Sequence, residues 1–375
     1  MRIALLNYEY LALPTPKHLL ARFAPLQWQA EGLQQAGAEV YVFQRFHTSE
    51  NFVQNGVVYH FWADRLPAEL RLVQIPATLH QAVKQLQLDV VHGHGLRFPL
   101  QVAALRQSLS ARTSLLVQQH SELPGHPIKN LLQRLCFRGV DAFLFPTAGM
   151  AAAWRRARVL GAQPVHIVQE CSRPMQPGDK AAARATTGMR GDPAVLWMAR
   201  LVQHKDPLTV LNGFEQVAQV LPEIRLYMGH GHADPLLAMV RTRIAQSYVL
   251  QRAVILLGEI ARADLDAYYQ STDYFVSGST RYGGIIALLE ALGCGAVPIV
   301  TDIEAYRNMT DDGRIGALWQ PGIARSFADA LLGAVQNKLH TQHCERAIAY
   351  FNQHLSLSAV SENLMAVYAE TQHKK

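Results

Sequence analysis

The chain has 375 residues, of which 49% are hydrophobic and 17% are charged, and its formal net charge is +6. This balance excludes disordered, collagen-like and low-complexity proteins, and the length predicts two domains of roughly 100–200 residues each. Residues 1–170 contain 16 Lys and Arg against 10 Asp and Glu, whereas the remaining residues are balanced, so the whole excess lies in the first half.

The excess of positive charge has two interpretations. It is either scattered, or it forms a basic face near Arg134, Arg138, Arg155, Arg156 and Arg158 that meets an anionic membrane surface or an anionic acceptor. A nucleic-acid partner is not expected, because the basic residues are not interleaved with aromatic stacking residues.

Cysteines and apolar runs indicate the compartment. The four cysteines form no CxxC pair, which excludes a zinc ribbon or a disulfide scaffold and favours a reducing environment. The N-terminal apolar run is too short for a signal peptide, and the apolar stretch 283–300 is interrupted by Glu290 and Pro298. We expect a cytoplasmic protein, with peripheral contact at the inner face of the membrane left open.

Short apolar runs in the first half alternate with helical patterns. They predict strands at residues 2–6, 39–43, 57–62, 89–92, 114–118, 142–145 and 165–168, and an amphipathic stretch from about 17 to 36 predicts one long helix. Such continuous apolar strands between helices are typical of parallel sheets that are covered on both faces.

The second half repeats this pattern, and a different composition separates the two halves. Strands are predicted at 194–199, 224–229, 253–258, 273–278 and 297–300, and the chain after residue 326 reads as helical. We predict an α/β protein with a Rossmann-like doubly wound domain over 1–170, a linker over 171–193, a second such domain over 194–355 and a helix over 356–375.

Two cations follow the first strand of the second half. Arg200 and Lys205 lie in the segment RLVQHKDP, from which they could bind a diphosphate from two directions. The helix expected to begin near Asp206 and Pro207 would add backbone N–H groups that favour anions. The spacing alone also fits two solvated loop cations.

A glycine- and serine-rich loop follows the strand at 273–278. Gly283 and Gly284 open an apolar helix that carries one carboxylate, Glu290. Backbone N–H groups at such a helix start suit phosphate or sugar oxygens, and a ribose diol would compensate the cost of a carboxylate in an apolar helix. The alternative is a capped or snorkelling Glu290.

Together these segments resemble the retaining glycosyltransferases of family four, which have the GT-B fold. Ala199–Asp206 is similar to the family's GRLxxxKG loop, and Ser279–Pro298 is similar to its PSxxEGFGLxxLEAMACGxPVV block. The spacing of Gly229 and Gly231 is similar to its hxGxG motif, and the first half matches more loosely, through DVVHGH at 89–94 and through His120.

The resemblance implies two facing domains, the first for the acceptor and the second for a nucleotide-sugar donor, with the last helix crossing back to the first domain. Arg200 and Lys205 would neutralise the diphosphate, Glu290 would hold the ribose, and His120, if not simply a core histidine, would reach the donor sugar. The remaining donor-binding positions implied by the family motifs are Gly229, Gly258, Tyr282, Gly283, Gly284 and Ile285.

Two positions depart from the family pattern. Tyr282 replaces the first Glu of the Glu-x7-Glu motif, and a phenol cannot supply the charge-assisted acceptor of a carboxylate. Either the donor sugar differs, with Arg281 indicating an acidic sugar, or the protein is a weak or inactive relative that binds a nucleotide sugar or a partner. The family's glycine pair after the first strand is also missing, since Ala21-Arg22-Phe23 stands there.

No metal or cofactor is expected. Asp264 and Asp266 read as the start of a helix, and the pairs His92/His94 and His230/His232 lack a third ligand at an identifiable spacing. We therefore predict metal-independent transfer, with retention at the anomeric carbon, from a nucleotide-diphosphate sugar to an unidentified acceptor: a glycan, a lipid-linked molecule or a small molecule. A sugar-nucleotide epimerase is a further alternative.

Overall fold

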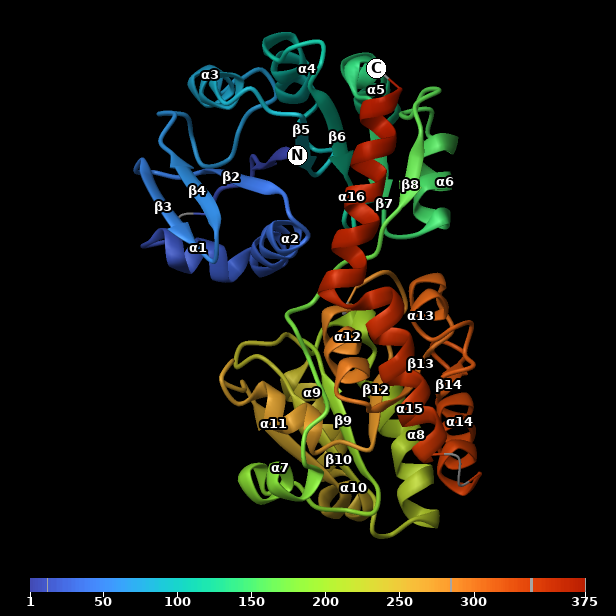
Figure 1. Cartoon of the computed structure of the whole chain (residues 1–375). Coiled ribbons are helices and arrows are strands. Elements are labelled where there is room, and N and C mark those ends of the chain that lie inside the picture. Colours follow the sequence, from blue (N-terminus) through green and yellow to red (C-terminus); the bar gives the residue numbers. More distant parts are fainter. Residues whose placement is uncertain (12, 284, 338–339, 375) are drawn as a thin grey trace. The chain divides into compact units, whose positions relative to one another are not determined.

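The computed structural model describes residues 1–11, 13–283, 285–337 and 340–374. The chain folds into two compact units, coloured blue to green with the red C-terminal helix for unit 1, and green to orange-red for unit 2 (Figure 1). Unit 1 comprises Met1–Cys171 and Leu357–Lys375, and unit 2 comprises Ser172–Ser356.

The sheet of unit 1 has eight strands in the order β3-β4-β2-β1-β5-β6-β7-β8, and only β3 runs antiparallel to its neighbour. The strands are β1 (Arg2–Asn7), β2 (Glu39–Arg45), β3 (Glu50–Gln54), β4 (Val57–Trp62), β5 (Val90–His94), β6 (Ser114–Gln118), β7 (Ala142–Phe145) and β8 (Val165–Ile167). The seven strands predicted in this half are confirmed, and β3 is an additional hairpin strand. The order reverses between β1 and β5, where ligands of doubly wound sheets bind.

Helices cover this sheet. They are α1 (Pro16–Arg22), α2 (Ala24–Gln35), α3 (Ala77–Gln85), α4 (Pro99–Ser108), α5 (Pro127–Cys136), the 3₁₀ turn η1 (Phe137–Gly139), α6 (Ala148–Arg156) and α16 (Leu357–His373). The single long helix expected at 17–36 is wrong, because the chain breaks at Phe23 and restarts with Pro25 in the first turn of α2, a position where proline is favoured.

Unit 2 has a fully parallel six-stranded sheet in the order β11-β10-β9-β12-β13-β14. Its strands are β9 (Ala194–Met198), β10 (Arg225–Gly229), β11 (Val254–Gly258), β12 (Tyr274–Ser277), β13 (Val297–Thr301) and β14 (Ala317–Trp319). Alternate residues of β9 enter two different cores, Val195 and Trp197 on one face and Ala194 and Leu196 on the other. Both faces are therefore buried, as the continuous apolar strands predict.

The helices of unit 2 are α7 (Lys180–Thr187), the 3₁₀ turn η2 (Gln203–Lys205), α8 (Pro207–Val220), α9 (Leu237–Ala245), α10 (Tyr248–Ala253), α11 (Leu265–Gln270), α12 (Ile285–Gly293), α13 (Glu304–Met309), α14 (Ala324–Gln336), α15 (His340–Tyr350) and the π turn η3 (Phe351–Leu355). Asp206 caps α8 by accepting from Thr209 N, and Pro207 follows as its first residue.

The segment expected as a linker, 171–193, is largely structured within unit 2. It contains α7, which Asp179 caps and which packs against α11. Lys180 and Arg184 both pair with Asp273 at the start of β12. The polar composition that suggested a linker thus serves a surface helix that is held by ion pairs.

The C-terminal helix α16 folds with unit 1. It packs against α2, and the hydroxyl of its Tyr368 lies 2.7 Å from Nδ1 of the buried His92 on β5. No helix in the described part of the chain is long and apolar enough to cross a bilayer.

The contact between α8 and α14 leads to a stability prediction. A Cβ on Gly213 would lie 2.4 Å from the carbonyl oxygen of Ala324 and 2.7 Å from the ring of Phe327. Gly213→Ala is therefore expected to overpack this contact and lower stability by about 1–3 kcal/mol, measured by thermal unfolding. Gly333→Ala, in α14 with nothing within 4 Å, is the control and should stabilise by about 0.5–1 kcal/mol. An equal loss in both variants would contradict the packing argument.

Candidate active site

Two loops of unit 2 meet at the carboxyl ends of the neighbouring strands β9 and β12. The first carries Arg200 and Lys205, and the second runs from Ser277 to Gly283. The backbone N–H of Thr280 donates to the carbonyl of His204 at 2.9 Å, which joins them. The structure thus brings together two segments about 75 residues apart that the sequence singled out separately.

Lys205 is buried, with only 7% of its surface exposed. Its Nζ donates to Ser279 Oγ at 3.2 Å, and a Cβ on Gly283 would lie 3.4 Å from Nζ. Among the described residues, no carboxylate lies within ion-pair distance of Lys205. Burial, and then the charge of Arg281, lower the pKa of Lys205 to about 8. A buried ammonium without an acidic partner favours an anionic ligand.

Further positive groups surround Lys205. Arg281 lies 3.4 Å from Nδ1 of His204, and the pKa of His204 is lowered by burial and by the charges of Lys205, Arg281 and Arg200. Helix α12 begins at Ile285, so it adds its N-terminal N–H groups to the same region. Gly284 lies outside the described residues.

Hydrogen bonds from Tyr306 and Thr301 hold the loop from Ser277 to Gly283. The hydroxyl of Tyr306 lies 2.8 Å from Ser277 Oγ and donates to the carbonyl of Gly283 at 3.3 Å. Thr301 donates to the carbonyl of Ser279 at 2.5 Å, and the half-buried Tyr282 packs against the core around α12.

Asp234 organises the other side of the site. This buried carboxylate accepts the N–H groups of Leu201 and Gly231, at 2.7 and 2.9 Å, and pairs with Arg200 Nε at 3.2 Å. The Arg200 side chain is otherwise exposed, at 72%. Hydrogen bonds and ion pairing lower the pKa of Asp234 despite the opposing effect of burial. The sequence contains no signal for this residue.

Gly229 and Gly258 end the adjacent strands β10 and β11 and are partners in register. Gly258 has a positive φ of 73°, which glycine adopts without strain, and its carbonyl accepts from His230 N at 2.8 Å. In the strand order, β10 and β11 lie on the opposite side of β9 from β12, so both glycines border that side of the site.

Glu290 has a protein partner that the sequence does not indicate. It is buried, and its Oε1 accepts from Arg173 Nε at 2.9 Å. Arg173 also pairs with Asp266, in the first turn of α11. Arg173 therefore compensates the carboxylate that seemed to require a ribose diol, and contact between Glu290 and a ribose stays a prediction. Asp266 belongs to this ion-pair network, and the described residues contain no group of three His, Cys, Asp or Glu arranged for a metal.

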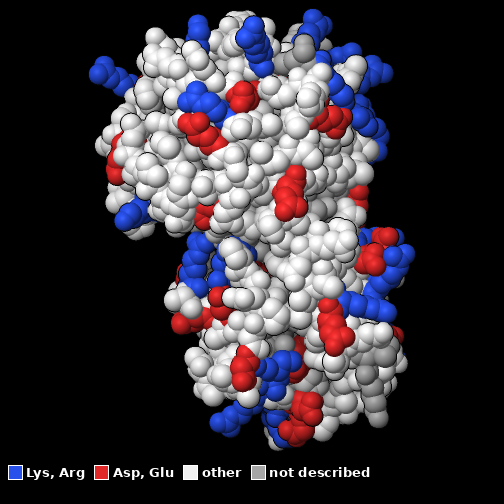
Figure 2. Space-filling view, viewed as in Figure 1, with Lys and Arg blue, Asp and Glu red and all other residues white. Residues whose placement is uncertain are grey.

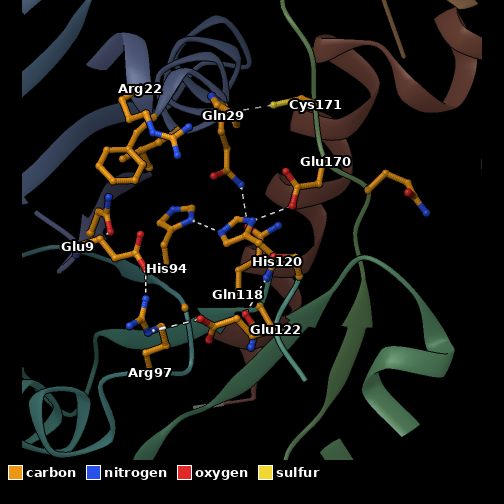
Figure 3. Close-up of a pocket in the computed structure, with 18 of the residues that line it drawn as sticks. Glu9, Arg22, Gln29, His94, Arg97, Gln118, His120, Glu122, Glu170 and Cys171 are labelled. Carbon is orange, nitrogen blue, oxygen red and sulfur yellow. Dashed lines mark hydrogen bonds and ion pairs between the residues drawn. The ribbon is translucent and has the colours of Figure 1, made fainter. Parts of the chain in front are cut away.

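His120 lies in unit 1, in a cavity of ≈ 300 Å³ at the carboxyl ends of β1, β5 and β6 (Figure 3). These ends align because Asn7, His94 and Gln118 are successive partners across the sheet. Arg97 forms ion pairs with two glutamates: its Nη1 lies 3.1 Å from Glu9 Oε1, and its Nε lies 3.4 Å from Glu122 Oε1. Arg22 and Phe23 also line the cavity.

Glu170, His120 and His94 form a chain of hydrogen bonds. Glu170 Oε1 lies 2.8 Å from His120 Nδ1, and His120 Nε2 lies 2.9 Å from His94 Nδ1 (Figure 3). Burial opposes the charge on His120, but Glu170, followed by Glu9 and Glu122, outweighs it and raises its pKa. Burial, His92 and His120 lower the pKa of His94. When His120 is protonated, it donates to both neighbours.

This arrangement also fixes the proton on His94. A neutral His94 would then accept through Nδ1 and carry its proton on Nε2, a buried atom for which the described residues supply no hydrogen-bond partner. Glu170 is a site residue that sequence reasoning missed, since it follows His120 by 50 positions in no recognisable motif.

Families known from other proteins match both units. Residues 179–353 match the family described as glycosyl transferases group 1, and residues 25–170 match the glycosyl transferase 4-like domain.

Two curated relatives are similar over part of their length. The phosphatidyl-myo-inositol mannosyltransferase of Mycobacterium tuberculosis is 28% identical over 200 residues, which are 50% of this chain and 50% of that protein. The alpha-monoglucosyldiacylglycerol synthase of Streptococcus pneumoniae is 28% identical over 155 residues, 40% of this chain and 34% of that protein. The chain thus spans half or less of the length of these relatives.

Solved structures share the fold over the whole chain. A glycosyltransferase from Rickettsia africae has a TM-score of 0.79 at 12% identity, covering 100% of this chain and 99% of that one. Anabaena HepE in complex with UDP has a TM-score of 0.73 at 15% identity, covering 99% and 100%. The predicted fold class, two parallel-sheet α/β domains of the GT-B type with a helical C-terminal region, is confirmed. The two units are therefore each similar to a glycosyltransferase domain, unit 2 to the glycosyl transferases group 1 and unit 1 to the glycosyl transferase 4-like domain.

Proposed function

We propose that this protein is a glycosyltransferase that moves a sugar from a nucleoside-diphosphate sugar to a hydroxyl group of an acceptor. The observation that carries the proposal is Lys205, a buried ammonium without a carboxylate partner among the described residues, beside Arg281 and the start of α12. A diphosphate supplies the negative charge that this site lacks.

The same cations would promote the reaction. As the bond between the sugar and the diphosphate breaks, negative charge grows on the leaving phosphate oxygen. Lys205 and Arg200 would stabilise that charge more strongly in the transition state than in the ground state, which raises the rate of the chemical step. Asp234 positions Arg200 by holding Nε, leaving the outer nitrogens of its guanidinium for a ligand.

The proposal also specifies the class of the donor sugar and the class of the acceptor. Arg281 adds positive charge beside Lys205, which supports a donor sugar bearing a carboxylate. The acceptor would occupy the cavity around His120 in unit 1. The names of the two curated relatives point to lipid acceptors, so a polar lipid headgroup is the first acceptor class to test.

Retention of anomeric configuration follows from the family resemblance. The acceptor oxygen would attack from the face that the diphosphate leaves, and the leaving phosphate would take the hydroxyl proton. This route needs no protein nucleophile and no metal, and His120 would bind a hydroxyl of the sugar rather than act as the base.

The first prediction concerns nucleotide binding at Lys205. Without metal, one of UDP, GDP, ADP or CDP is expected to stabilise the protein by about 2.7 kcal/mol at 100 times its dissociation constant. Lys205→Met should weaken that affinity by about 1.5–3 kcal/mol, the cost of losing a charge-assisted hydrogen bond. Titration calorimetry and thermal unfolding measure both effects. The ligand-free variant should melt no lower than the wild type, because it no longer buries an ammonium.

The pH dependence supplies the matched control. A diphosphate favours the charged form of Lys205, so above a pKa of about 8 binding must first protonate it, and affinity should fall by up to about tenfold per pH unit. Lys205→Arg stays charged throughout and should remove this fall. A wild-type nucleotide affinity that stays constant from neutral pH to well above the pKa of Lys205 would contradict the role of Lys205.

The second prediction concerns the product. Incubation with the identified nucleotide's sugars, uronic acids included, and a lipid acceptor is expected to yield a glycoside with the anomeric configuration of the donor, read by NMR. An inverted centre would contradict the retaining mechanism. Tight nucleotide binding without transfer to any acceptor or hydrolysis of any donor would favour the weak or inactive relative that Tyr282 suggests.

The third prediction concerns His120. Glu170→Gln removes the largest influence that raises the pKa of His120 and leaves the opposing effect of burial, so this pKa should fall, as measured by NMR titration of the histidine ring. Glu9→Gln, a more distant carboxylate, should lower it less. If His120 contributes to turnover as a cation, the alkaline limit of activity should move to lower pH in Glu170→Gln. An unchanged His120 pKa would exclude the pairing.

A further inference from the structure

Helix α5 places its apolar side chains outward and its polar side chains inward. Ile128, Leu131 and Leu135 are 75%, 59% and 47% exposed, whereas Asn130 and Gln133 are buried. Positions three, four and seven apart share one face of a helix, so the three aliphatic residues form a continuous stripe. A helix of a water-soluble surface has the opposite arrangement.

Specific hydrogen bonds fix this orientation. Asn130 donates to the carbonyl of Gly125 at 3.0 Å, and Gln133 donates to the carbonyl of Leu96 at 2.8 Å. Both buried amides therefore satisfy backbone acceptors of neighbouring loops. Rotating the helix to bury its leucines would break both bonds, so the exposed stripe is a stable feature of unit 1.

Positive charge borders the stripe. At 100° per residue, Arg134 falls beside Leu131, and Arg138 lies in the turn η1 that follows α5; both are exposed. The end of α6 adds the exposed Arg155 and Arg156, and this helix touches the segment that leads into α5, because Trp154 Nε1 donates to the carbonyl of Glu122 at 3.1 Å. Lys and Arg side chains gather at this corner of unit 1 in Figure 2, where Figure 1 draws α5 and α6.

We propose that the α5 surface, formed by Ile128, Leu131, Leu135, Arg134 and Arg138, docks on a lipid bilayer that contains anionic phospholipids. The aliphatic side chains would enter the boundary between headgroups and acyl chains, and the arginines would meet lipid phosphates. The charge distribution supports this occupant: unit 1 carries 18 Lys and Arg against 12 Asp and Glu, whereas unit 2 is balanced.

A second copy of the chain fits the same surface less well. A symmetric contact through α5 would place Arg134 and Arg138 of both copies in one interface, where their like charges repel. A bilayer offers both an apolar layer and negative charge within one interface. The proposal goes beyond sugar transfer and does not depend on which nucleotide unit 2 binds.

The test is flotation of the full chain with vesicles of phosphatidylcholine alone or of an equal mixture with phosphatidylglycerol. We expect binding to the anionic vesicles and little to the neutral ones, with loss of binding at high salt. Ile128→Ser/Leu131→Ser/Leu135→Ser should abolish binding. The matched control is Val53→Ser/Leu72→Ser/Val73→Ser, three other exposed aliphatic residues of unit 1, which should bind as the wild type does.

The arginines have their own controlled comparison. Arg134→Gln/Arg138→Gln should weaken binding to anionic vesicles by about fivefold for each arginine. Arg65→Gln/Arg71→Gln makes the same change of net charge at other exposed positions of unit 1 and should weaken binding much less.

Three outcomes would overturn the proposal. They are no binding of the wild type to anionic vesicles, equal loss in the α5 variants and their controls, or a change of oligomeric state in the triple α5 variant without any lipid binding by the wild type. Nucleotide-induced stabilisation should be unchanged in every α5 variant. A failure of lipid docking is therefore distinguishable from a failure of the proposed sugar transfer.

Discussion

The central constraint of unit 2 is the burial of a positive charge without an opposite one. Lys205 Nζ donates to Ser279 Oγ and lies beside Gly283, where a Cβ would be in van der Waals contact with it. Removing an ammonium from water is costly, and burial lowers its pKa to about 8, so the site is stable but electrostatically incomplete. The hydrogen bonds of Tyr306 and the start of α12 hold the neighbouring backbone in place, and in the proposed function an anion would complete the site.

Unit 1 uses the opposite arrangement, in which charges are compensated inside the protein. His120 is held between Glu170 and His94, and Arg97 lies between two glutamates. Such a polar cavity orients its groups before a ligand arrives and suits a neutral, hydroxyl-rich molecule. Under the proposed function the two units would divide the chemistry: unit 2 would stabilise a charged leaving group, and unit 1 would position hydroxyl groups. The outward apolar stripe of α5 would bring unit 1 to lipid-borne acceptors.

The strand pattern shows how far local sequence carries the fold. All twelve predicted strands are present, because uninterrupted apolar runs bury on both faces of a parallel sheet wherever they lie in the chain. The missed elements have weak local signals. β3 is a polar edge strand. The polar composition of α7 is typical of a linker, and the helix is held by the ion pairs of Lys180 and Arg184 with Asp273. The break between α1 and α2 depends on one proline.

In the candidate site, short motifs are enough to identify Arg200, Lys205 and the glycine-rich loop before α12. These segments follow neighbouring strands, and parallel strands end at one edge of the sheet. The partners of the candidate site residues depend on contacts between segments that are far apart in the chain. Arg173 lies 117 positions from Glu290, and Glu170 lies 50 positions from His120. Likewise, only the packing of Asn130 and Gln133 turned the leucines of α5 outward. Periodicity reports which residues share a face, but the direction of that face depends on long-range contacts that no local pattern encodes.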